Sequence, residues 1–241
     1  MTGLQFASSI VSLPLGPERE LAIFQQLTLG NVPEFLRTPK TLTVKASGHI
    51  VHVDVLLDVL CVGTDDDFMR VPLNPKTAQK AADLFGGTLI TPALSDLIWQ
   101  QADVRIDPLD VTMPPTPEMT TTTWFINQNL KVEKHRAGRL GLLAGHKKDV
   151  VLCNALSRTD LKNKHVAIYG WHRTTGQPIQ GLNPSSHSIE YADYSHGIRL
   201  IADDVLVDGN PVAFTDAVAD PALASALNKD GVLMYTRYPT T

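Results

Sequence analysis

The order in which helix and strand patterns follow one another constrains the fold of this chain most. Prolines followed by apolar residues at helical spacing predict helices that begin at Pro17, Pro75, Pro92 and Pro221. Alternating segments rich in β-branched residues are concentrated after Leu140. The sequence therefore predicts an α+β fold, not a repeated β-α-β fold, with helices mainly in the N-terminal and middle part and a mostly antiparallel sheet in the C-terminal half.

Individual elements can be assigned from the same patterns. Helices are expected over residues 17–30, 75–85, 92–101, 124–136 and 221–227. A hairpin is expected from strands 41–46 and 49–62, which flank a Ser-Gly turn. Further strands are expected over residues 68–73, 140–144, 149–153, 165–172, 197–202 and 205–207.

We expect residues 1–241 to form a single domain. The proline-rich segment 107–117 is the one linker-like stretch, and it marks an alternative boundary between two lobes. A chain of this length should bury about 70 to 75% of the surface that its unfolded form exposes, so it needs neither a disulfide nor a metal in order to fold. Cys61 and Cys153 both lie in apolar runs, and the sequence leaves open whether they pair.

Charge and hydropathy exclude several classes of protein. The chain has 21 Lys and Arg against 25 Asp and Glu, with no block of like charges, which argues against a nucleic-acid partner. There is no apolar run of membrane-spanning length, and the start has no charged segment ahead of an apolar core. We therefore expect a soluble protein without a signal peptide, either cytoplasmic or exported as a trimmed mature form.

Residues suited to chemistry gather between positions 146 and 196. Five of the eight histidines lie there, beside tyrosines, a tryptophan and an aspartate: His146, His165, His172, His187 and His196, with Tyr169, Trp171, Tyr191, Asp193 and Tyr194. Imidazole serves both proton transfer near neutral pH and metal ligation. The sequence places the candidate site in this segment.

Two chemistries use the same residues. In the first, His187, Asp193 and His196 bind zinc, with His172 as a tentative additional ligand, and an open coordination position activates water. In the second, which is free of metal, Asp193 orients His196, and Tyr194 or Ser195 acts as the proton donor or nucleophile.

Substrate contacts can be assigned around these residues. Trp171, Tyr191 and Tyr194 would form a wall that stacks on a sugar or peptide plane. Lys147 belongs to an electropositive turn over residues 145–149, which suits an anionic group of a substrate; the alternative is a solvated turn.

The segment Ser195-His196-Gly197-Ile198-Arg199 resembles a motif of the L,D-transpeptidases. In that family a cysteine nucleophile follows the glycine, and a histidine and an arginine support it. This chain has no cysteine between Gly197 and Ile198, so the thiolate mechanism cannot operate. What the resemblance implies is a cleft position for His196 and Arg199, the latter as a substrate-binding residue.

Two further resemblances involve the same region. Ser185, His187 and Asp193 follow the order of a zinc D-Ala-D-Ala carboxypeptidase signature, although the His-Asp spacing is six and not seven. Three segments within residues 145–200 are similar to segments of uncharacterised bacterial proteins: Gly-His-Lys-Lys-Asp, Tyr-Gly-Trp-His and Tyr-Ala-Asp-Tyr-Ser-His-Gly. This similarity implies a bacterial origin and no particular activity.

Our leading hypothesis is a hydrolase or group-transfer enzyme that acts on a polar substrate, for example a glycan or peptide of the cell envelope. The first alternative is a non-catalytic carbohydrate-binding module. The second is a purely structural role, in which the same polar residues form a buried hydrogen-bonded network.

Overall fold

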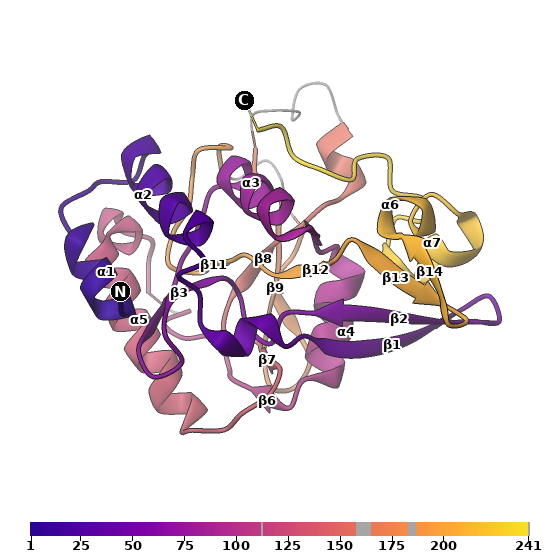
Figure 1. Ribbon diagram of the computed structural model, residues 1–241, viewed down its shortest axis with the longest axis horizontal. Coiled ribbons are helices and arrows are strands. Elements are labelled where there is room, and N and C mark those ends of the chain that lie inside the picture. Colours follow the sequence, from indigo (N-terminus) through magenta and orange to yellow (C-terminus); the bar gives the residue numbers. More distant parts are fainter. Residues whose placement is uncertain (112, 158–164, 183–186, 241) are drawn as a thin grey trace.

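The fold is of the mixed α+β class, as the sequence predicted, and most of its strand pairs are antiparallel (Figure 1). The computed structural model describes residues 1–111, 113–157, 165–182 and 187–240. In this part of the chain, no helix is long and apolar enough to span a membrane.

Proline and capping side chains start most of the helices. Asn74 and Thr91 accept the backbone N–H of Thr77 and Leu94, which caps two helices where the sequence predicted their starts. The α-helices are α1 (Gly3–Ser9), α2 (Pro17–Thr28), α3 (Pro75–Phe85), α4 (Pro92–Gln101), α5 (Thr122–Arg136), α6 (Phe214–Ala217) and α7 (Pro221–Leu227). Short 3-10 turns are η1 (Glu34–Arg37), η2 (Pro117–Thr120) and η3 (Asn154–Ser157).

Two larger sheets organise the described strands. The six-stranded sheet has the order β14 (Asn210–Ala213), β13 (Asp204–Val207), β2 (His49–Val55), β12 (Leu200–Ala202) and β5 (Gly87–Leu89), and β1 (Lys40–Ala46) also pairs with β2. The four-stranded sheet has the order β10 (Pro178–Gln180), β9 (Ile168–His172), β8 (Lys148–Val150) and β11 (His196–Gly197). Two short pairs join β3 (Cys61–Gly63) to β4 (Phe68–Arg70) and β6 (Val104–Arg105) to β7 (Leu143–Ala144).

The strand expected over residues 197–202 is divided between these sheets. Its first part, β11, pairs in parallel with β8, whereas β12 pairs with β2 and β5. The chain passes from one sheet to the other between β11 and β12. There the Ile198 carbonyl accepts the Leu60 N–H at 2.8 Å. The strand expected over residues 49–62 is likewise interrupted after Val55 and resumes at Cys61.

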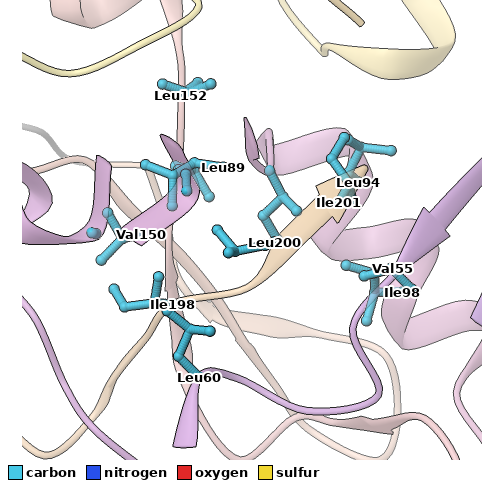
Figure 2. Packing of buried hydrophobic residues seen from close by; sticks show 14 of the residues in the cluster. Val55, Leu60, Leu89, Leu94, Ile98, Val150, Leu152, Ile198, Leu200 and Ile201 are labelled. Carbon is cyan, nitrogen blue, oxygen red and sulfur yellow. The ribbon is translucent and has the colours of Figure 1, made fainter. Parts of the chain in front are cut away.

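One large apolar cluster joins the two sheets. It contains residues from Phe6 near the N-terminus to Tyr238 near the C-terminus. Figure 2 shows part of it, with Val150 of β8 and Leu200 of β12 in the same buried region. Cys61 and Cys153 are both buried and do not form a disulfide with each other, which answers the question left open by the sequence.

Candidate metal centre

Three side chains able to ligate a metal converge within the described residues. They are His187, Asp193 and His196, whose ligand atoms all lie within 4.8 Å of one another. Asp193 and His196 are buried, and His187 is half-buried. The same three residues were the main metal ligands expected from the sequence, and the structure brings them together.

A tight turn fixes the relative positions of Asp193 and His196. The Asp193 carboxylate accepts the backbone N–H of Ser195 at 2.8 Å and the Ser195 hydroxyl at 2.6 Å. The His196 N–H donates to the Asp193 carbonyl at 3.1 Å, and the Lys148 N–H donates to the Ser195 carbonyl at 2.7 Å. An Asp that bonds the residue two positions ahead is well suited to such a turn. The turn therefore delivers His196 to the first position of β11, beside β8.

Tyr191 connects the three candidate ligands. Its ring stacks on that of His187, with centroids 4.2 Å apart and planes 9° apart. Its hydroxyl donates to Asp193 at 3.0 Å, and its ring meets that of His196 edge-on at 5.6 Å. Because partners of this kind orient metal ligands, Tyr191 and Ser195 fit a supporting shell around the group.

Electrostatics gives the group the protonation states that a metal requires. Burial alone would raise the pKa of Asp193, but His196, Ser195 and Lys148 together lower it to about 2. Burial lowers the pKa of His196 to about 4 and also lowers that of His187. Near neutral pH the group therefore offers an ionised carboxylate and neutral imidazoles, which are the ligating forms of these side chains.

His196 carries the clearest unsatisfied polar atoms of the group. Its side chain is 1% exposed, and in the described part of the chain neither Nδ1 nor Nε2 has a hydrogen-bond partner. A buried polar group without a partner costs about 1 to 3 kcal/mol. Such a group calls for an explanation, and an ion is one of the ordinary ones.

The expected metal-free relay does not have its hydrogen bond. Asp193 accepts hydrogen bonds from Ser195 and Tyr191, and none joins it to the ring of His196 among the described residues. The Ser195 hydroxyl is buried and donates to Asp193, so it is held away from a role as nucleophile. Burial raises the pKa of Tyr194, which opposes its ionisation.

The aromatic residues expected to form a substrate wall are packed against each other instead. Trp171 and Tyr194 are only 7% and 6% exposed, and their rings meet edge-on at 6.4 Å. The ring centroid of Trp124 of α5 lies 6.1 Å from that of the same tyrosine. Tyr191 is half-buried, and one of its faces is covered by His187. These rings therefore offer little open surface for stacking on a substrate.

The two cationic residues expected to bind substrate are bonded to backbone carbonyls. The Lys147 ammonium is buried and donates to the Tyr194 carbonyl, and burial lowers its pKa to about 7. Arg199 is buried where the chain changes sheets and donates to the carbonyls of Leu56 at 2.9 Å and Leu143 at 2.7 Å. Both contacts hold parts of the fold together.

The other clustered histidines lie outside the candidate metal group. The tentative additional ligand His172 bonds Asp96 at 2.7 Å and stacks on Trp99 of α4, so it belongs to a separate polar cluster. His146 bonds Asp58 at 3.1 Å. The ring of His165 bonds the backbone carbonyl of His187. Ser185, the first residue of the peptidase-like signature, lies outside the described residues.

Two features of the structure were missed at the sequence level. The first is the position of Lys148, which the sequence assigned only to the turn over residues 145–149 and which is the register partner of His196 across β8 and β11. The second is the buried pair of Asp58 and Arg70, joined at 2.6 Å. An acid inside the apolar run of residues 55–62 was a signal for the second; the first depends on strand register, which no local pattern shows.

Comparison with known proteins gives this chain no relative, since no protein-family model, no curated protein and no solved structure matches it.

Proposed function

We propose that this protein is a metal-dependent hydrolase in which His187, Asp193 and His196 hold a single zinc ion. One observation carries the proposal: a buried histidine, neither of whose ring nitrogens is paired among the described residues, lies within 4.8 Å, atom to atom, of a second imidazole and an ionised carboxylate. Zinc bonds of 2.0–2.1 Å in a tetrahedral site would separate ligand atoms by about 3.3 Å, so the ligand atoms of this group would have to move closer together on binding.

A zinc ion held by these three side chains would keep a coordination position open for water. When bound, it would supply a water whose pKa is near 7 and a Lewis acid for a carbonyl or phosphoryl oxygen. The residues of this chain would hold and orient the ligands. Tyr191 and Ser195 fix the Asp193 carboxylate, and Tyr191 fixes the plane of His187. Peptides and glycans with polar groups, including those of the cell envelope, are the substrates to assay first.

A purely structural role for His196 has less support. A structural histidine contributes through the hydrogen bonds that it makes, whereas both ring nitrogens of His196 are unpaired among the described residues. Without a ligand, burial of this ring costs stability. The candidate site therefore resembles a position that a ligand completes.

The first experiment measures metal in the full chain after purification without chelator, by elemental mass spectrometry. We expect about one zinc per chain, lost in His187→Ala and in His196→Ala. His135→Ala is the matched control, because His135 is an exposed histidine on α5 outside the group. Melting curves of each variant show that the fold is kept.

Two results would contradict the proposal. The first is a folded protein without metal that also takes up no added zinc. The second is stoichiometric iron, because a group of two histidines and one carboxylate around iron serves oxygenases and not hydrolysis. If zinc is bound, hydrolysis of peptide, ester and phosphoester substrates should depend on it and be lost in the same two variants.

A further inference from the structure

Lys148 stands beside His196 on the neighbouring strand. The two residues are register partners in the parallel pairing of β8 with β11, and Figure 1 shows these strands side by side at the centre of the fold. Side chains at paired positions leave a sheet on the same face, whereas successive residues alternate between faces. Lys148 therefore extends on the face that carries His196, and the preceding residue Lys147 extends on the opposite one.

The Lys148 ammonium has no carboxylate partner among the described residues. Its Nζ atom lies 4.6 Å from the centroid of the Trp171 ring, and none of the ion pairs found in those residues includes it. Its positive charge reaches the whole group, since it lowers the pKa of Asp193 and those of His187 and His196. Lys147, by contrast, is bonded to a backbone carbonyl.

The residues around the group differ in exposure. His187, Tyr191 and Lys148 are half-buried, whereas Asp193 and His196 are buried. Solvent therefore reaches the group at these three residues more than at the two buried ligands. The Lys148 cation would repel a metal ion unless negative charge lies between them.

We propose that Lys148 is the anion-binding residue of this site, so that the substrate carries a phosphate or carboxylate oxygen that lies between its ammonium and the group formed by His187, Asp193 and His196. The inference rests on the proposed function for the position of the reacting group. It narrows the substrate class from polar compounds in general to oxyanions and their esters or peptides, and it makes neutral glycans poor substrates.

The test titrates inorganic phosphate, and separately acetate, into the zinc-loaded full chain by isothermal titration calorimetry. Tighter binding of phosphate identifies a phosphoryl substrate, and tighter binding of acetate a carboxylate. Lys148→Met keeps the apolar stem over Trp171 and removes the charge. We expect it to weaken binding of the preferred anion about tenfold or more, the loss of one charge-assisted hydrogen bond. Lys45→Met, on the exposed part of β1, is the control and should bind as the wild type does.

Zinc affinity gives a second readout that a merely structural lysine would not move. Removing a nearby positive charge should make zinc bind severalfold more tightly to Lys148→Met, whereas loss of structure would weaken zinc binding. Lys148→Arg should retain anion binding. Equal anion affinity in wild type and Lys148→Met would overturn the inference, and so would a wild type that binds neither anion.

The two proposals can fail separately. If the wild type takes up no zinc, the metal-hydrolase proposal is wrong; the same titrations on the zinc-free chain then decide on Lys148 alone. Anion binding that is lost in Lys148→Met would still support the anion subsite. Zinc uptake with no effect of the Lys148 variants would leave the metal centre supported and the anion subsite refuted.

Discussion

Two buried histidines of this protein each lie beside an aspartate, and they differ in the hydrogen-bond partners of their ring nitrogens. His146 belongs to the Asp58–Arg70–His146 cluster, in which its Nε2 bonds Asp58 at 3.1 Å and the Arg70 guanidinium bonds the same carboxylate. Its Nδ1 has no partner among the described residues, so one of its two ring nitrogens is paired. His196 belongs to the candidate metal group of His187, Asp193 and His196 and has neither ring nitrogen paired among the described residues. Burial lowers the pKa of both rings to about 4.

We call the Asp58–Arg70–His146 cluster closed, because its charged groups bond one another, and the group of His187, Asp193 and His196 open, because ring nitrogens there lack partners among the described residues. Arg70 also bonds Asn129 at 2.9 Å and Glu133 at 2.6 Å, so the cluster neutralises its own aspartate and joins β4 to α5. In the open group the aspartate is held by Ser195 and Tyr191, which leaves the imidazoles for something else. A similarly lowered histidine pKa therefore accompanies two different hydrogen-bond environments.

Breaking the closed cluster should have the largest effect. Arg70→Met leaves the Asp58 carboxylate buried without its cation, since both side chains are at most 2% exposed. We expect the free energy of unfolding to fall by about 3 to 5 kcal/mol. Chemical denaturation followed by circular dichroism measures it.

The matched control is Arg37→Met, because Arg37 pairs with Glu34 on the surface, where both side chains are exposed. Its loss should stay below about 1 kcal/mol. Similar losses in the two variants would show that the Asp58–Arg70–His146 cluster does not stabilise the fold in the way that its geometry indicates.

His146 should contribute to the pH dependence of stability, as His196 does in the zinc-free chain, because burial lowers the pKa of both rings to about 4. The unfolded chain binds a proton near pH 6.5, the ordinary pKa of histidine, whereas the folded chain binds it only near pH 4. The contribution of His146 to the free energy of unfolding is therefore fully present above about pH 6.5 and is lost as the pH drops toward 4. At about 1.4 kcal/mol per pKa unit, one such histidine contributes at most about 3 kcal/mol to this loss.

Denaturant unfolding of the zinc-free chain at pH 7 and pH 5 measures this dependence. His146→Gln removes the titrating ring, so its stability should fall less between the two pH values than that of the wild type. His135→Gln, which changes an exposed ring, should behave as the wild type does. A dependence in His146→Gln as steep as that of the wild type would contradict the assignment.

Local elements of this fold could be predicted because their signals are local. The sequence identified Pro75 and Pro92 as the first residues of α3 and α4, and both helices end where expected. The Ser47-Gly48 turn that was expected between β1 and β2 has the positive φ values, 49° and 92°, that suit a two-residue hairpin turn. Helix α1, which lacks acids in its first turn, was missed.

Long-range placement could not be predicted in the same way. The three metal-binding candidates were chosen for their chemistry, and two of them lie only three residues apart in one turn. The position of Lys148 opposite His196 depends on the register of a parallel strand pair, and that of His172 depends on its contact with α4. Strand register and tertiary contacts are set by the whole core and not by neighbouring residues.

Substitutions around the open group should change the affinity for zinc rather than the stability of the fold. Tyr191→Phe keeps the ring on His187 and removes the hydroxyl that bonds Asp193 at 3.0 Å. Loss of such a supporting partner should weaken zinc binding about 10- to 100-fold. Competition with a fluorescent zinc chelator measures the affinity.

Tyr169→Phe is the corresponding control, because the Tyr169 hydroxyl bonds Asp96 and not the candidate metal group. Its zinc affinity should equal that of the wild type. If Tyr191→Phe binds zinc as tightly as the wild type, the tyrosine does not orient Asp193 in the bound state.

The smallest effect is expected at His172. Its ring is buried and bonds the half-buried Asp96, which also bonds the exposed Lys229 and the buried Tyr169, and these partners remain for the carboxylate when the ring is replaced. His172→Gln should therefore lower the free energy of unfolding by about 1 kcal/mol or less. Zinc content and affinity should not change, because the ring lies outside the group of converging ligands. Elemental analysis of His172→Gln and His196→Ala side by side measures the difference in zinc content. A His172 variant that lost its zinc would extend the metal centre to a fourth residue.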